Sequence, residues 1–102
     1  MTTHAATRTA TAVTLVTSPG CHYCDDAHTH LRTLIEDGTR IELTVIEATS
    51  AEGRSLLDAH RPAMYPLVLI DGDYFSAGRL PRRKLDALLQ HRAVETETLR
   101  HG

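Results

Sequence analysis

The sequence predicts a single α/β domain, built on a four-stranded mixed β-sheet with helices on both faces. The chain has 102 residues, of which 41% are hydrophobic and 24% charged, as is ordinary for a globular domain with one modest core. Segments with strand and helix periodicity follow one another in the order β-α-β-α-β-β-α. The first half of that order requires parallel strands joined by a helix, and the second half requires an antiparallel hairpin covered by a helix.

The first strand and helix are the most clearly patterned elements. Residues 12–17 are apolar and β-branched, which favours a strand. A helix is expected to begin at Cys21 or His22 and to end at Glu36, before Asp37-Gly38. Its apolar residues recur with helical spacing, at Ala27, Leu31, Leu34 and Ile35.

A second strand and a short helix follow. Residues 41–46 alternate and then become continuously apolar, which predicts a strand. The segment Thr49-Ser50-Ala51-Glu52 has the spacing of a capping box, so we expect a helix to begin there. Gly53 weakens that helix near its start.

The second half predicts a hairpin and a last helix. Tyr65-Pro66 precedes residues 67–70, a continuous apolar run suited to a buried strand. Asp71-Gly72 is a hairpin turn signal, and residues 74–76 are the expected returning strand. Pro81 suits the first turn of a helix. The apolar face of that helix consists of Leu85, Leu88 and Leu89.

The two ends of the chain are expected to differ from the domain between them. We expect residues 1–10 to be disordered, residues 11–92 to form the folded domain, and residues 93–102 to form a charged tail. The first ten residues contain no apolar core of a signal peptide, and no stretch is apolar enough to span a membrane. We therefore expect a cytoplasmic protein.

Composition also argues against several classes of partner. The net charge is −2, and the chain has no Trp and one Phe. It therefore has neither the positive surface potential nor the aromatic side chains for stacking bases that nucleic-acid-binding proteins commonly use. We expect a monomer that binds neither nucleic acid nor membrane, and we predict no cofactor.

The motif Cys21-His22-Tyr23-Cys24 contains both cysteines of the chain. Two thiols three residues apart at a strand-to-helix junction are placed to cycle between dithiol and disulfide. The positive end of the helix favours a thiolate, so Cys21 is the predicted nucleophile. Cys24 lies one turn deeper and is expected to resolve the mixed disulfide.

The element order, the CxxC motif at the start of a helix and the proline before the third strand together resemble the thioredoxin fold. More narrowly, the chain resembles the glutaredoxin-like proteins over roughly residues 12–90. The matching segments are Val13-Thr14-Leu15-Val16, Ser18-Pro19-Gly20-Cys21-His22-Tyr23-Cys24-Asp25-Asp26-Ala27, Tyr65-Pro66-Leu67-Val68-Leu69-Ile70-Asp71-Gly72 and Ser76-Ala77-Gly78-Arg79-Leu80.

This resemblance implies a thiol–disulfide oxidoreductase. Its partner would be a disulfide-containing protein or a low-molecular-weight thiol, and its electrons would come from glutathione-like thiols or from a thioredoxin reductase. His22 stands where glutaredoxins carry a proline. A protonated His22 would stabilise the Cys21 thiolate and make the disulfide more oxidising.

The resemblance also implies a substrate groove. Pro66 is expected to be cis, which would expose the backbone of Tyr65 for strand-like pairing with a substrate. Met64 and Tyr65 would line the same groove, and Tyr23 would flank the thiols and offer a hydroxyl to a substrate. A second group, near the start of the last helix, is expected to bind a carboxylate of a substrate or partner; it consists of Ser76, Gly78 and Arg79.

Two other functions remain open from the residues. Cys21, Cys24, His22, His28 and His30 are metal-donor side chains close in sequence, and an Fe–S cluster shared by two subunits could use Cys21 from each. The chain offers no second cysteine pair for a zinc site, so no metal ligand is predicted. A thioredoxin-like adaptor that binds partners without turnover is the third possibility.

Overall fold

The computed structural model describes residues 10–101 of the chain, and the side chains as far as residue 94. The segment expected to be disordered, residues 1–10, lies outside the described residues except for Ala10. The elements are β1 (Thr11–Thr17), α2 (His22–Glu36), β2 (Ile41–Glu47), α3 (Ala51–His60), β3 (Leu67–Ile70), β4 (Asp73–Ala77) and α4 (Arg82–His101). This order confirms the predicted β-α-β-α-β-β-α arrangement.

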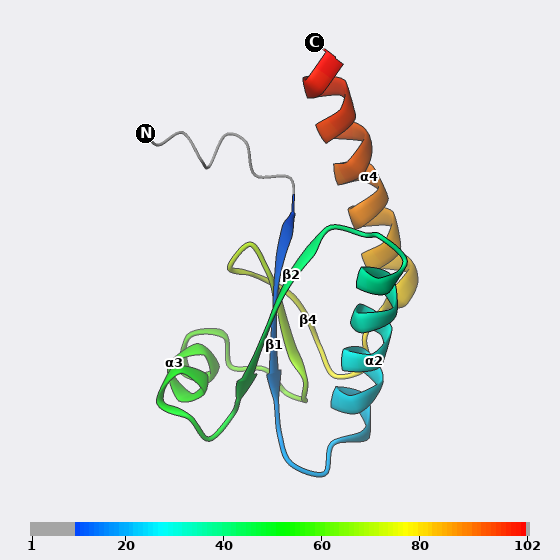
Figure 1. Ribbon diagram of the computed structural model, residues 1–102. Helices are drawn as coiled ribbons and strands as arrows, with labels where there is room; N and C mark the ends of the chain where they lie inside the picture. Colours follow the sequence, from blue (N-terminus) through cyan, green and yellow to red (C-terminus); the bar gives the residue numbers. More distant parts are fainter. Residues whose placement is uncertain (1–9, 102) are drawn as a thin grey trace.

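The four strands form one mixed sheet in the order β2-β1-β3-β4. β1 pairs with β2 in parallel and with β3 in antiparallel orientation, and β4 pairs antiparallel with β3. Helices α2 and α4 lie on one face of the sheet and α3 lies on the other (Figure 1). The predicted three-helix α/β architecture is therefore confirmed.

The core has one cluster on each face of the sheet, because successive strand residues point to opposite faces. On the side of α2 and α4 the buried residues are Val13, Leu15, Ala27, Leu31, Val68, Ile70, Phe75, Leu80, Leu85 and Leu89. On the side of α3 they are Val16, Ile46, Leu67 and Leu69. All four residues of β3 are buried, as expected for a central strand covered on both faces.

The start of α3 differs from the sequence prediction by one residue. Ser50, and not Thr49, is the N-cap: its Oγ accepts a hydrogen bond from Gly53 N at 3.0 Å and donates one to Glu47 O at 2.7 Å. A Cβ at Gly53 would clash with the backbone carbonyl of Glu47. The absence of a side chain at Gly53 therefore lets the first turn of α3 pack against the end of β2.

The hairpin between β3 and β4 has the predicted turn. Asp71 and Gly72 both have positive φ angles, 53° and 87°, as a two-residue type I′ turn requires. Asp71 also joins this turn to two other elements, because its carboxylate accepts a hydrogen bond from Ala12 N and forms an ion pair with Arg92 of α4.

The last helix is longer than the sequence pattern suggested. Its backbone continues through residues 93–101, which were expected to form a charged tail. No Gly or Pro interrupts this stretch, so nothing in the sequence stops the helix at residue 92. The upper part of α4 extends beyond the sheet in Figure 1.

Candidate functional site

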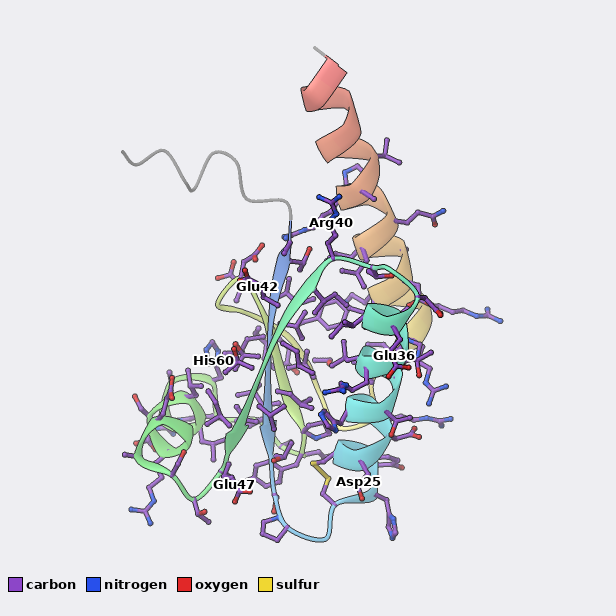
Figure 2. All side chains as sticks on the ribbon, in the orientation of Figure 1. Asp25, Glu36, Arg40, Glu42, Glu47 and His60 are labelled. Carbon is purple, nitrogen blue, oxygen red and sulfur yellow. A yellow bond between two sulfur atoms is a disulfide. The ribbon has the colours of Figure 1, made fainter. Side chains whose placement is uncertain are left out.

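The two cysteines of the CxxC motif form a disulfide. Cys21 and Cys24 are bonded to each other, and their Cα atoms are 5.2 Å apart. The disulfide lies at the base of α2, where it appears as the yellow bond in Figure 2. The chain is thus described in its oxidised form.

The N-terminus of α2 is built around Cys21. Cys21 is the N-cap residue in an extended conformation, and its Sγ accepts a hydrogen bond from Cys24 N at 3.1 Å. Its carbonyl oxygen accepts the first helical hydrogen bond, from Asp25 N at 3.2 Å. The sulfur therefore lies at the end of the helix where free N–H groups and the helix dipole stabilise negative charge.

The two sulfur-bearing residues differ in their access to solvent. Cys24 is buried, with 3% of its surface exposed, whereas Cys21 is partly exposed. An external disulfide can therefore reach the first cysteine more readily than the second. This asymmetry is what an attacking and a resolving thiol require.

Three segments that are distant in sequence meet at this end of the sheet. Val16 near the end of β1 pairs with Leu67 at the start of β3, so Pro66 lies beside the strand end that leads to Cys21. Gly78, just after β4, donates a backbone hydrogen bond to Pro66 O at 3.0 Å. The register therefore places the start of β3 and the end of β4 at the end of the sheet where the CxxC loop begins.

The loop before β3 has the conformation implied by the family resemblance. The Tyr65–Pro66 peptide bond is cis, and Pro66 is fully buried. Met64 and Tyr65 remain accessible, with 51% and 37% of their surface exposed. Tyr23, within the CxxC motif, is 42% exposed.

Gly78 holds part of this loop in place. Its φ angle is +88°, and a Cβ at this position would lie 3.3 Å from both Cβ and Sδ of Met64. Met64 therefore packs closely against the backbone at the end of β4. A side chain at Gly78 would strain the backbone and displace this methionine.

The other residues assigned from sequence lie in different environments. Ser76 is only 8% exposed, and its Oγ has no hydrogen-bond partner among the described residues. Arg79 is exposed in the connection between β4 and α4, and His22 is exposed on the first turn of α2. The structure thus brings Met64, Pro66 and Gly78 into one cluster, while it buries the hydroxyl of Ser76.

Contacts between α2 and α4 were not anticipated from sequence. Arg82 Nη2 lies 3.1 Å from Asp26 Oδ2, and His30 Nε2 lies 3.4 Å from Asp86 Oδ1. The partners are 56 residues apart, so no local pattern could have paired them. These contacts set the first turns of α4 beside the helix that carries the disulfide.

Neither a metal cluster nor a membrane helix is found in the described part of the chain. No group of three or more His, Cys, Asp or Glu side chains there could hold a metal ion. No helix in the same region is both long and apolar enough to cross a membrane.

Comparison with known proteins identifies the fold but does not identify a specific activity. No protein-family model matches the sequence, and a search of curated proteins finds no match either. Among solved structures, the chain is similar to an uncharacterized thioredoxin-like protein from Clostridium perfringens, with a TM-score of 0.64 and 11% sequence identity. The similarity covers 83% of this chain and 72% of the other. The chain therefore has a thioredoxin-like fold with a CxxC disulfide at the start of its first helix.

Proposed function

We propose that the protein is a glutaredoxin-like thiol–disulfide oxidoreductase that works by a dithiol mechanism. The observation that carries this proposal is the Cys21–Cys24 disulfide at the N-terminus of α2, with one cysteine accessible and the other buried. A disulfide that closes so short a loop adds little to stability. A redox role explains its position better than a structural one.

In the proposed reaction, the reduced protein transfers two electrons to a substrate disulfide. The Cys21 thiolate attacks one substrate sulfur, the substrate S–S bond breaks, and one substrate thiolate leaves. The Cys24 thiolate then attacks Sγ of Cys21 and releases the second substrate thiolate. The protein ends with the Cys21–Cys24 disulfide, and the substrate ends as a dithiol.

The surroundings of the disulfide support a role in holding the substrate. Tyr23, Met64 and Tyr65 provide exposed apolar surface, and the cis peptide bond before Pro66 leaves the Tyr65 backbone available for strand-like pairing. We propose that an extended segment of a disulfide-containing protein, or a low-molecular-weight thiol, binds along this loop.

The electron donor is part of the proposal. A thiol of the glutathione type or a thioredoxin reductase would reduce the Cys21–Cys24 disulfide after each turnover. We propose a cytoplasmic location, because in a reducing compartment a CxxC pair is more often catalytic than a structural disulfide.

Two cysteine variants test the function. The reduced wild-type protein is expected to reduce insulin or a small disulfide, and Cys21→Ser is expected to be inactive. Cys24→Ser should accumulate a mixed disulfide on Cys21, detectable by mass spectrometry and released by dithiothreitol. If wild type and Cys21→Ser bind partners equally and neither reduces a disulfide, the protein is an adaptor and the proposal is wrong.

A further inference from the structure

A group of basic side chains lies beside the disulfide although the chain as a whole is negatively charged. The net charge is −2, yet four of its eleven Lys and Arg residues lie within six positions, and no Asp or Glu occurs between Asp73 and Asp86. All four side chains are exposed. We call this group the basic corner; it consists of Arg79, Arg82, Arg83 and Lys84.

Contacts in the structure place the basic corner close to the redox site. Arg79 follows Gly78, whose backbone N–H donates a hydrogen bond to Pro66 O. Both residues lie at the end of the sheet next to the CxxC loop. Arg82 bridges from α4 to Asp26, which lies two residues after Cys24 on α2. The corner therefore flanks the end of α2 that carries the disulfide.

The nearby acidic groups cancel only part of this charge. Asp26 is paired with Arg82, and the Asp86 carboxylate lies against His30 of α2. Asp25, labelled in Figure 2, precedes Asp26 and is offset from it by about 100° around α2, away from the Arg82 contact. Arg79, Arg83 and Lys84 thus add positive charge on the α4 side of the disulfide.

The arrangement of these charges suits an extended acidic surface better than a small anion. Arg82, Arg83 and Lys84 are consecutive on a helix, so their side chains leave the axis in directions about 100° apart. Lys84 is also drawn toward β4, where its Nζ lies 5.2 Å from the centre of the Phe75 ring. One carboxylate cannot contact all of them, whereas several acidic side chains on a protein surface can.

We propose that the redox partner of this protein is a protein that carries acidic residues beside its reactive disulfide, and that the basic corner steers it to Cys21. This inference rests on the proposed oxidoreductase function. Opposite charges near a reactive site accelerate encounter by about tenfold or more at low ionic strength, and salt removes the effect.

The test is a single-turnover reaction of the reduced protein with three disulfide-closed peptides. The peptides carry Glu, Gln or Lys at the same positions beside the disulfide, and the release of peptide thiols is measured. At low salt the Glu peptide should react at least about tenfold faster than the Lys peptide. The rates should converge at about 1 M salt, where the screening length falls to roughly 3 Å.

Charge reversal then assigns the effect to the basic corner. In Arg83→Glu, the rate for the Glu peptide divided by the rate for the Gln peptide should fall several-fold. The matched control is Arg54→Glu on exposed α3, across the sheet, where the same ratio should stay at the wild-type value. Equal falls in the two variants would mean that overall charge, and not the corner, sets the rate, and would overturn the inference.

Two further outcomes separate the inference from the function on which it rests. If none of the peptides is reduced, the oxidoreductase function itself is wrong. If all three are reduced at one rate at low salt, the function stands and the acidic-partner inference is wrong. Oxidised glutathione serves as a small anionic disulfide, and an equal loss of its rate in Arg83→Glu would contradict the assignment to a protein surface.

Discussion

The N-termini of α2 and α3 are built with the same geometry but from different atoms. At α3, Ser50 Oγ accepts a hydrogen bond from Gly53 N at 3.0 Å; at α2, Cys21 Sγ accepts one from Cys24 N at 3.1 Å. Ser50 also donates to Glu47 O, so its hydroxyl uses both of its roles within the fold. Sulfur is a weaker acceptor than oxygen. At α2, the N-cap acceptor is thus the Cys21 sulfur, which is the atom that we propose as the nucleophile.

The largest expected effect comes from giving α2 the same cap atom as α3. Cys21→Ser supplies a good N-cap but removes the nucleophile. Disulfide reduction should fall by roughly a thousandfold or more, because a serine hydroxyl is not ionised near neutral pH and has no neighbouring base in the proposed mechanism. Thermal unfolding of this variant should occur at or above the temperature of the reduced wild-type protein. A loss of both activity and stability would show that Cys21 has a structural role as well.

The two N-termini also differ in how far the sequence predicted them. The CxxC motif has a strong local signal, and helix α2 begins where the sequence indicated, at His22. At α3 two adjacent residues could each serve as the cap, and the spacing of Thr49 to Glu52 favoured the wrong one. Ser50 Oγ also donates to Glu47 O, three residues earlier in the chain, and the capping-box spacing does not include this local contact.

Long-range contacts are the features of the structure that the sequence did not predict. The β-strands, the hairpin turn and the cis bond before Pro66 were all expected, because each has a local signal or belongs to the family resemblance. The pairing of Arg82 with Asp26 and the packing of Met64 on Gly78 have no local signal. They depend on the sheet order and on where α4 lies on the sheet.

The second prediction concerns the close packing beneath the α3 cap. Gly53→Ala places a methyl group against Glu47 O, and either α3 or the end of β2 must shift. Overpacking of this kind typically costs 1–3 kcal/mol, and we expect a loss of about 3 kcal/mol in the free energy of unfolding, measured with urea. Ser55→Ala, at an exposed position in the same helix, is the matched control and should be neutral or slightly stabilising.

The third prediction concerns the residue that follows the α2 cap. His22 is the first residue of α2, a position where proline is well tolerated, so His22→Pro should preserve the helix. It removes a side chain that can be positively charged beside the Cys21 thiolate. The reduction potential should fall by about 30 mV, which corresponds to a tenfold change in the equilibrium with a thiol buffer. If the wild-type protein and His22→Pro have equal reduction potentials, His22 does not influence the potential.

The smallest expected effect concerns the two N-cap residues, Ser50 and Cys21. Ser50→Ala should lower the free energy of unfolding by about 1 kcal/mol, since it leaves Gly53 N without its acceptor. Cys21→Ala, compared with the reduced wild-type protein, removes the weaker sulfur cap and should cost less than Ser50→Ala. Urea unfolding under reducing conditions measures both losses on one scale. A larger loss for Cys21→Ala would mean that the sulfur stabilises α2 more than the hydroxyl stabilises α3, and that the reactive cysteine also has a structural role.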